Sequence, residues 1–339
     1  MGNPYIILLL SLGFSLIFSL PVAAFPTDEK IMEMTNSVVK VHVNDRDGNY
    51  GIGSGFVVSE NHVVTSCHVI ASAHSVRVAK EGVRYKPIAY KADWHHDLCI
   101  LKFDDLPLKP LSLGDSANLK YEQEVFALGF PQNSPRSQPT FGFIKALYPL
   151  DDSAVIRTSA GFRLGASGGP LLDDDGEVIG ITTFKDPGRF NNFYYSLPVK
   201  WVKELLQQPD IADMIQREPP FWDVPENERP FFMRVVPPLK AKRWSELEPL
   251  AKSWAAQEPS NAEPWYYLGL AEYNLQHVNE AIGHLQKAIE LNQAHTSAYF
   301  QLGLIAAEQG NKNEAQRISL ILIKLDTEAS DALNKAVGP

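Results

Sequence analysis

The residues best suited to chemistry in this chain are a serine in a glycine-rich run and two polar residues far upstream. The run is Gly165-Ala166-Ser167-Gly168-Gly169-Pro170, and the upstream residues are His68 and Asp97. A serine hydroxyl attacks a carbonyl at neutral pH only when a base takes its proton, a third group orients that base and donors stabilise the oxyanion. Glycines beside the serine let the backbone turn sharply and bring N–H groups close to the reacting carbonyl. These residue types therefore indicate nucleophilic catalysis by Ser167.

The glycine-rich run by itself fits two different arrangements of a catalytic serine. It satisfies the G-x-S-x-G elbow of α/β-hydrolases, in which the acid and the histidine follow the serine along the chain. The histidines after Ser167 all fall in a helical region described below: His277, His284 and His295. His68 and Asp97 precede the serine, and this is the order found in chymotrypsin. Chain order therefore argues against the elbow.

Seven short motifs occur in a fixed order over residues about 33 to 205: Gly53–Val58, Thr65–Ile70, Asp97–Lys102, Ala127–Pro131, Gly165–Pro170, Gly180–Thr183 and Tyr195–Pro198. Together they resemble a trypsin-like serine protease domain of the HtrA/Deg branch. The resemblance implies an all-β fold of two packed antiparallel barrels with the catalytic residues between them. His68 and Asp97 would come from the first barrel and Ser167 from the second.

The resemblance also implies a role for each residue of this site. Ser167 attacks the scissile carbonyl, His68 accepts and later returns its proton, and Asp97 orients the imidazole. The backbone N–H groups of Gly165 and Ser167 form the oxyanion hole. The non-catalytic alternatives are that His68 is a buried histidine, Asp97 a turn residue and Ser167 a loop serine. The flanking motifs that all three share with the family favour catalysis.

Positions around the serine predict control and specificity. Digestive members of the fold carry an aspartate directly before the serine, whereas this chain has Ala166, so we expect control by ordering of the loop at residues 161–165. The position that sets specificity in the family is Gly161, followed by Phe162. An uncharged site cannot stabilise a cation leaving water, which predicts cleavage after small or apolar residues. The strand edge expected to pair with substrate backbone contains Thr183, Phe184 and Lys185.

The amino-terminal segment predicts export. Residues 5–20 are almost wholly apolar and are followed by small residues at cleavage-site spacing, which is typical of a signal peptide over residues 1–24. The absence of Lys or Arg before the apolar core leaves an uncleaved anchor open. The two cysteines, Cys67 and Cys99, lie on strands that the resemblance pairs, so they either form a disulfide or remain buried thiols.

Composition excludes several classes of function. The chain has 339 residues, so it suits two domains and a linker, and its net charge of −9 argues against nucleic-acid binding. The histidines, His95-His96-Asp97 included, match no known zinc pattern, and Gly51–Gly55 lacks the third glycine of a dinucleotide fingerprint. The sequence therefore predicts no metal and no cofactor.

Four segments follow from the changes in pattern along the chain. They are a signal peptide (1–24), a trypsin-like domain (25–207), a proline-rich connector (208–242) and a helical domain (243–339). An amphipathic helix at Val199–Leu206 would close the second segment. The prolines of the connector exclude a regular helix or central strand there, and its aromatic residues predict that it is pinned to one or both domains.

The helical domain contains an internal repeat of 34 residues. Trp265, Leu268 and Gly269 recur as Tyr299, Leu302 and Gly303, a period that resembles the tetratricopeptide repeat. Such repeats imply a concave face that binds a partner protein or peptide. Candidates for that face are Tyr266, Tyr267, Tyr273, Asn274, His277 and Gln301.

The sequence thus predicts a periplasmic or secreted serine endopeptidase with a helical repeat domain that binds substrates or a partner protein. The alternative is a binding scaffold whose protease domain is silent or tightly regulated.

Overall fold

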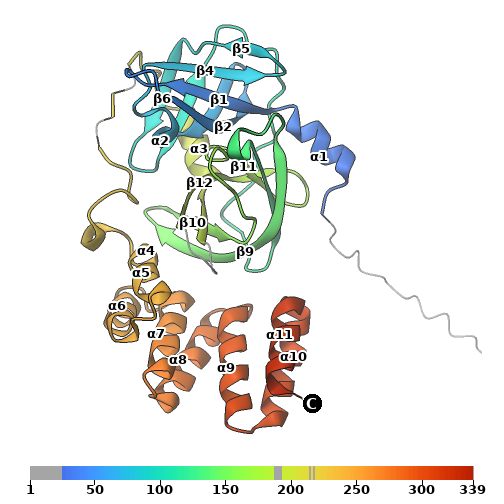
Figure 1. The fold of residues 1–339 in the computed structure, drawn as a ribbon, viewed down its shortest axis with the longest axis vertical. Helices are drawn as coiled ribbons and strands as arrows, with labels where there is room; N and C mark the ends of the chain where they lie inside the picture. Colours follow the sequence, from blue (N-terminus) through green and yellow to red (C-terminus); the bar gives the residue numbers. More distant parts are fainter. Residues whose placement is uncertain (1–24, 187–192, 214, 217, 339) are drawn as a thin grey trace, which may run out of the picture.

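The computed structural model describes residues 25–186, 193–213, 215–216 and 218–338, with two β-structures at one end of the molecule and a stack of helices at the other (Figure 1). The predicted signal peptide at residues 1–24 lies outside the described residues. Helix α1 (Asp28–Thr35) precedes the first strand and is capped by the Thr27 side chain. In the described part of the chain, no helix combines the length and the apolar character that crossing a bilayer requires.

The first β-structure is a seven-stranded antiparallel sheet that forms a half-barrel. It contains β1 (Val38–Asn44), β2 (Tyr50–Ser59), β3 (His62–Ser66), β4 (Ser75–Lys80), β5 (Val83–Tyr85), β6 (Ala89–Asp93) and β7 (Leu98–Lys102), in the order β5-β4-β1-β2-β3-β7-β6. Buried β-branched residues such as Val39, Val41 and Val63 form its core, as their preference for a pleated surface predicts. The short helix α2 (Cys67–Ile70) follows β3 directly.

The second β-structure is a closed barrel. Its strands are β8 (Glu124–Gly129), β9 (Gln138–Leu150), β10 (Ser153–Thr158), β11 (Pro170–Leu172), β12 (Val178–Asp186) and β13 (Phe193–Pro198), and they pair in the order β10-β13-β12-β11-β8-β9. The short 3₁₀ turn η1 (Pro131–Asn133) follows β8. The all-β architecture predicted from the sequence is confirmed, with one refinement. Hydrogen bonds close the second structure, whereas the first has two edge strands, β5 and β6, that do not pair with each other.

The helix predicted after the last strand is confirmed as α3 (Val199–Leu206), which buries Val199, Trp201, Val202 and Leu205. The connector then runs along the half-barrel. Ile211 exchanges two backbone hydrogen bonds with Tyr90 of β6, at 2.7 and 3.0 Å.

The exclusion of regular helix from the connector is wrong for residues 231–240. The connector forms the 3₁₀ turn η2 (Glu226–Glu228) and then α4 (Phe231–Arg234) and α5 (Val236–Lys240). Pro230 caps α4, and Pro237 lies in the first turn of α5. Proline is tolerated at a helix start because the N–H that it lacks would have no acceptor within the helix there.

The helical domain consists of antiparallel helices packed in sequence order (Figure 1). They are α6 (Trp244–Gln257), α7 (Ala262–Asn274), α8 (Val278–Leu291), α9 (Thr296–Glu308), α10 (Lys312–Leu325) and α11 (Thr327–Val337). The pair α7–α8 and the pair α9–α10 are the two copies of the predicted repeat. Gly269 is needed between α7 and α8, because a Cβ there would lie 2.8 Å from the Leu285 side chain and 3.0 Å from the Ala281 carbonyl. The predicted tetratricopeptide-like stack is confirmed.

A polar network joins the helical stack to the closed barrel. Arg157 of β10 donates a 3.0 Å hydrogen bond to the Tyr267 hydroxyl of α7, and the Tyr121 hydroxyl donates to Glu263 at 2.9 Å. Glu263 is fully buried. Desolvation alone would lower the pKa of Arg157, but the surrounding Tyr148, Tyr267 and Glu263 groups raise it well above its usual value. The network therefore places the Arg157 guanidinium and the buried Glu263 side chain in the contact between the barrel and the stack.

This contact changes the interpretation of the repeat face. Tyr267, expected on a partner-binding surface, is 1% exposed, and Tyr266 is half-buried beside it. Both tyrosines, together with Gln301, line a cavity of about 620 Å³ whose opposite wall contains Arg157 and Lys145 of the barrel. The chain's own barrel therefore covers part of the face predicted for a partner.

Candidate active site

The first part of the candidate site is a histidine–aspartate pair on the half-barrel. Asp97 Oδ2 lies 2.7 Å from His68 Nδ1, and Asp97 Oδ1 accepts a 2.7 Å hydrogen bond from the His68 backbone N–H. The Asp97 side chain is 1% exposed and the His68 side chain 31%. The carboxylate thus fixes the imidazole through Nδ1 and leaves Nε2 to accept a proton.

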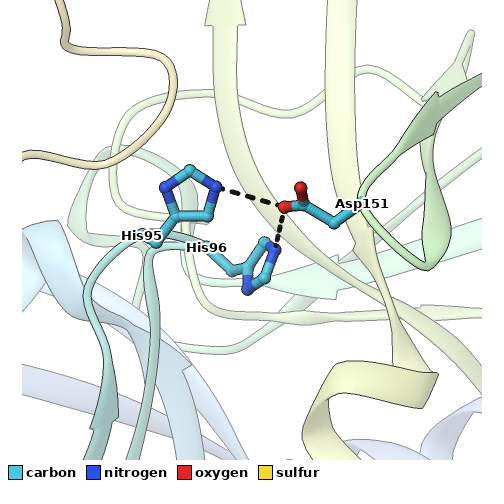
Figure 2. Close-up of side chains that lie close together, drawn as sticks. All are labelled: His95, His96 and Asp151. Carbon is cyan, nitrogen blue, oxygen red and sulfur yellow. Dashed lines mark hydrogen bonds and ion pairs between the residues drawn. The ribbon is translucent and has the colours of Figure 1, made fainter.

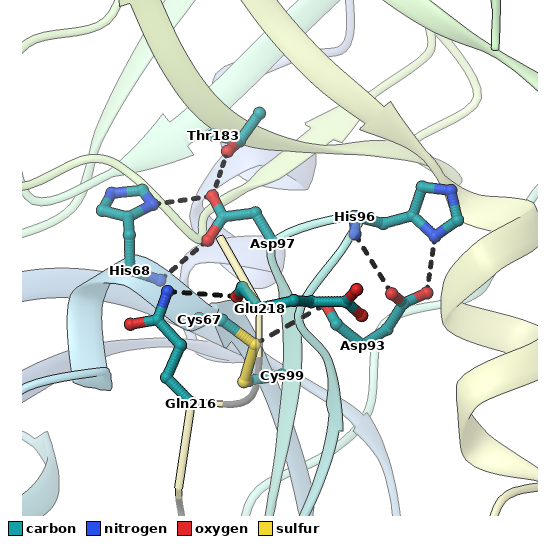
Figure 3. Close-up of a disulfide and its surroundings, with 9 residues drawn as sticks. All are labelled: Cys67, His68, Asp93, His96, Asp97, Cys99, Thr183, Gln216 and Glu218. Carbon is teal, nitrogen blue, oxygen red and sulfur yellow. Dashed lines mark hydrogen bonds and ion pairs between the residues drawn. A yellow bond between two sulfur atoms is a disulfide. The ribbon is translucent and has the colours of Figure 1, made fainter. Parts of the chain in front are cut away.

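Several features fix the region around Asp97, and Figure 3 shows the Thr183 bond and the nearby disulfide. Its backbone φ of 60° is left-handed, a conformation that aspartate tolerates better than most residues. The Thr183 hydroxyl donates a 2.5 Å hydrogen bond to Oδ2, and the Cys67 N–H donates a 2.9 Å bond to the Asp97 carbonyl. A disulfide joins Cys67 to Cys99, whose Cα atoms are 4.9 Å apart. Of the two alternatives left open for the cysteines, the structure contains the bridge.

Ser167 lies on a tight turn before β11 in the closed barrel. Gly165 and Gly168 have φ values of 96° and 89°, which residues with side chains rarely adopt. A Cβ on Gly168 would lie 2.2 Å from the Ser54 carbonyl oxygen, and one on Gly165 would lie 2.6 Å from that of Phe130. Ser54 ties the turn to the half-barrel, since its N–H donates to the Ser167 carbonyl and its hydroxyl to the Gly165 carbonyl, both at 2.8 Å.

The hydroxyl of Ser167 donates a 2.8 Å hydrogen bond to the backbone carbonyl of Thr183. Among the described residues, no hydrogen bond joins Ser167 to His68. The structure therefore brings Ser167, His68 and Asp97 together around Thr183, which bonds the serine through its carbonyl and the aspartate through its hydroxyl. Catalytic hydrogen bonds often form or shorten only when substrate is bound.

The predicted oxyanion donors are the N–H groups of Gly165 and Ser167. Within the described residues, neither N–H donates a hydrogen bond. The Leu164 carbonyl accepts a 2.7 Å bond from the Gln132 N–H. Because C=O and N–H point in opposite directions across a trans peptide, this bond turns the Gly165 N–H away from Gln132. The N–H groups of Gly165 and Ser167 are thus both without an acceptor among the described residues.

The predicted specificity residues line a cavity of about 400 Å³ behind the serine turn. Gly161, Phe162 and Ala166 contribute to its wall. Among the described lining residues, Arg163 is charged and none carries a carboxylate. Phe162 is buried against Tyr194, with ring centroids 5.2 Å apart. A Cβ on Gly161 would lie 3.1 Å from the same tyrosine ring, so a larger residue would crowd this wall.

The predicted substrate edge lies at a register shift in β12 between Thr182 and Lys185. Thr183 is buried, whereas Phe184 and Lys185 are partly exposed. The Phe184 ring stacks on that of Tyr195, with centroids 4.6 Å apart.

Sequence reasoning missed two features of this site. The Thr183 hydroxyl, which bonds Asp97, was predicted only as part of a substrate edge. Trp222 of the connector packs edge-on against the His68 ring at 5.5 Å between centroids and lies 5.6 Å from Phe184. The sequence indicated only that the aromatic residues of the connector, Trp222 included, must be buried against a domain. It did not indicate which surface they cover.

A second cluster of polar side chains lies beside the first, and Figure 2 shows both imidazoles directed at one carboxylate. Asp151 Oδ2 is 3.2 Å from His95 Nε2 and 3.0 Å from His96 Nε2. The three candidate ligand atoms lie within 4.8 Å of one another. These are the described residues that could hold a metal, although the sequence predicted none.

Comparison with known proteins defines the class of both parts of the chain. Residues 53–181 match the model of the trypsin-like peptidase domain, and residues 262–295 match that of the tetratricopeptide repeat. The chain therefore combines a trypsin-like peptidase domain with a tetratricopeptide repeat, and relatives of its peptidase part are named DegP and HtrA serine proteases.

One such relative is a probable periplasmic serine endoprotease DegP-like from Halomonas elongata, 35% identical over 165 residues, which are 46% of this chain and 35% of the relative. Serine protease HTRA4 from Mus musculus is 32% identical over 46% of this chain and 34% of its own length. This chain thus matches about a third of each relative. The active form of the Rv3671c protease from M. tuberculosis shares the fold, with a TM-score of 0.50 and 24% identity over 61% of this chain and 98% of that one.

Proposed function

We propose that this protein is an exported serine endopeptidase with Ser167 as nucleophile, His68 as general base and Asp97 as the group that orients the base. The proposal rests on one observation above all. Thr183 links the 2.7 Å Asp97–His68 pair to Ser167, because its hydroxyl donates to the aspartate and its carbonyl accepts from the serine. The names of the relatives support the same reaction class.

Substrate binding would start the reaction. A substrate strand added along Thr183, Phe184 and Lys185 presents backbone N–H groups to the edge of β12. An N–H that reaches the Thr183 carbonyl would replace the Ser167 hydroxyl as its donor. The hydroxyl would then turn to His68 Nε2, so that the imidazole takes the proton as Oγ attacks the scissile carbonyl.

The remaining groups stabilise the charges that develop. The oxyanion would accept hydrogen bonds from the N–H groups of Gly165 and Ser167, and loss of one such donor costs about 3 kcal/mol of transition-state stabilisation. Asp97 would stabilise the imidazolium until it protonates the leaving amine. Water would then hydrolyse the acyl-enzyme by the same proton route.

Specificity for small or apolar residues is proposed from the pocket beside Gly161 and Phe162. A basic substrate side chain would meet no carboxylate among the described lining residues and would lie near the Arg163 cation. A desolvated like-charge contact of this kind is unfavourable.

Export is proposed from the amino-terminal segment, and the Cys67–Cys99 disulfide is compatible with an oxidising compartment. For the helical repeats, we propose a protein or peptide partner on the part of the stack that the barrel leaves uncovered. His277 is exposed there, whereas Tyr267 is committed to Arg157.

The test uses a fluorophosphonate probe and the full-length mature protein. The probe should label wild type at Ser167, and Ser167→Ala should lose both labelling and cleavage of a denatured protein mixture. Ser260→Ala, at an exposed serine in the turn before α7, is the matched control. Peptide sequencing of the products by mass spectrometry gives the preference at the cleaved position. Equal cleavage by wild type and Ser167→Ala would remove the assigned nucleophile.

The regulated scaffold is a second candidate, favoured by the engagement of the Ser167 hydroxyl with Thr183. In that case labelling of Ser167 would require a bound peptide or partner, and free wild-type protein would react at the background rate of Ser167→Ala.

A further inference from the structure

We propose that His95, His96 and Asp151 form a metal site for a zinc-like divalent cation that clamps the half-barrel to the closed barrel. His95 and His96 lie in the turn between β6 and β7, and Asp151 lies in the turn between β9 and β10. The three ligands thus come from both β-structures and meet where the two turns approach (Figure 2).

The distances fit a tetrahedral ion. Bonds of about 2.0–2.2 Å from zinc to nitrogen or oxygen place neighbouring tetrahedral ligands about 3.3–3.6 Å apart. The separations of 3.0 and 3.2 Å between Asp151 Oδ2 and the two Nε2 atoms need to expand by a few tenths of an ångström to reach this range. The three ligand atoms as a set lie within 4.8 Å of one another, so their widest separation has to shorten as the ion binds. Two imidazoles and one carboxylate with an open fourth position are a donor set that zinc accepts.

Surrounding contacts orient the ligands before any metal binds. His96 Nδ1 lies 2.6 Å from Asp93 Oδ2, so the proton on Nδ1 is held there and Nε2 is directed at Asp151. A metal-ligating histidine usually has such a carboxylate on its other nitrogen. The His96 ring also stacks on Trp201 at 3.7 Å, and the indole N–H of Trp201 donates to Asp152 at 3.0 Å. Both turns are therefore fixed by the same tryptophan.

Access also fits a metal site. The His95 and Asp151 side chains are 44% and 50% exposed, which leaves room for a water or an exchanging ligand at the fourth position. His96, at 14%, is the anchored ligand.

Titration of metal-free full-length protein with Zn²⁺ or Co²⁺ alone tests the site. Calorimetry should give one ion per chain, and Co²⁺ should show the visible absorption of a low-symmetry nitrogen–oxygen site. His95→Ala and Asp151→Asn should weaken binding more than about tenfold, whereas His74→Ala, at an exposed histidine elsewhere, should leave it unchanged. Zn²⁺ should also raise the melting midpoint of wild type but not of Asp151→Asn.

Two results would overturn the metal site. One is the absence of Zn²⁺ binding to wild type with a circular dichroism spectrum that shows it folded. The other is an adventitious ion only, seen as weak binding of several ions that His95→Ala and Asp151→Asn leave unchanged.

A different set of contacts carries a second inference, which rests on the proposed function. We infer that Trp222 occupies the place of a substrate side chain, so that the connector occludes the active site of its own chain. Trp222 contacts the His68 ring on one side and Phe184 on the other. A substrate strand along β12 would need this same space between the base and the edge.

The connector packs on the peptidase part through specific contacts, but one of its polar groups is left without a hydrogen bond in the described part of the chain. Phe221 is buried against Phe184 and Phe232, and its N–H donates a 2.9 Å hydrogen bond to the His95 carbonyl. The indole Nε1 of Trp222 is buried, and among the described residues it has no hydrogen-bond partner. A buried donor without an acceptor makes the buried position of the Trp222 side chain less stable. Trp222 is therefore the part of this contact that a substrate can displace.

Trp222→Ala tests the occlusion in full-length protein. It should raise kcat/KM for peptides roughly tenfold, since two aromatic contacts no longer need to be broken. Labelling of Ser167 by a small fluorophosphonate should change much less. Trp265→Ala, in the repeats, is the control.

An unchanged or lower kcat/KM for Trp222→Ala, with wild type active, would overturn the occlusion alone. Lack of fluorophosphonate labelling in both wild type and Trp222→Ala would instead contradict the proposed catalytic function.

Discussion

Removal of the Cys67–Cys99 disulfide perturbs the region that carries both His68 and Asp97. The bridge joins the first residue of α2 to the second residue of β7, and Cys67 immediately precedes His68. The chain contains no other cysteine, so a reductant acts on this bond alone. Both sulfur-bearing residues are at most 1% exposed, which means that reduction should be carried out in denaturant before refolding.

The expected loss of stability follows from the loop that the bridge closes. The two cysteines are 32 positions apart. On the chain-entropy model, a loop of that size corresponds to about 4 kcal/mol of stabilisation through restriction of the unfolded chain. For a cooperative unit of peptidase size, this should lower the melting midpoint by roughly 8–16 °C.

Differential scanning calorimetry of oxidised and reduced wild type gives the effect of the crosslink with both sulfur atoms retained. Cys67→Ala/Cys99→Ala should melt no higher than the reduced protein, and its midpoint should not respond to reductant. Complete reduction, verified by thiol titration, with a midpoint within about 2 °C of the oxidised protein would refute the assigned contribution.

Three other perturbations test separate parts of the structure. Thr183→Val removes the hydroxyl that donates a 2.5 Å hydrogen bond to Asp97 and should lower kcat/KM about tenfold or more. Thr183→Ser keeps a hydroxyl and should have the kcat/KM of wild type. Equal values for wild type and both variants would contradict the role of this bond. Glu263→Gln replaces the buried side chain that accepts from the Tyr121 hydroxyl and should cost about 2 kcal/mol in urea unfolding, against no change for exposed Glu280→Gln. Burial lowers the pKa of His295 below its ordinary 6.5, so the unfolded chain binds a proton there that the folded chain does not. Stability from this group is present above that value and lost as pH falls below it. Melting midpoints should therefore fall from pH 7.5 to 5.5 less steeply in His295→Gln than in wild type, and parallel slopes would exclude His295.

Local patterns predicted the parts of the fold that depend on local physics. Alternating β-branched residues gave the strands, and the 34-residue period gave the helix pairs. Gly168 was expected at a sharp turn, and its positive φ beside Ser54 is the reason that glycine is needed there. The helix starts at Pro230 and Pro237 were missed because proline was considered only as a breaker, although the first turn of a helix accepts it.

Contacts between distant segments were outside the reach of spacing arguments. His95 and His96 form no zinc pattern by themselves, because Asp151 reaches them from a turn 55 positions further along the chain. Likewise, nothing in the connector's sequence says that Trp222 lies on His68. A motif encodes the groups that its own turn brings together, whereas these contacts depend on how the two β-structures and the connector pack.

The connector, which follows the last peptidase motif, also packs into the hydrophobic core of the peptidase part. Phe232 of the connector stacks on Tyr148 of β9 at 4.5 Å, and Tyr148 is completely buried. The same hydrophobic cluster contains Leu197 of β13 and Trp254 of α6. A fragment cut after residue 207 would therefore expose Tyr148 and Phe184 and would also lack Trp222. Since both changes affect the surface beside His68, the activity of such a fragment would not represent that of the full chain.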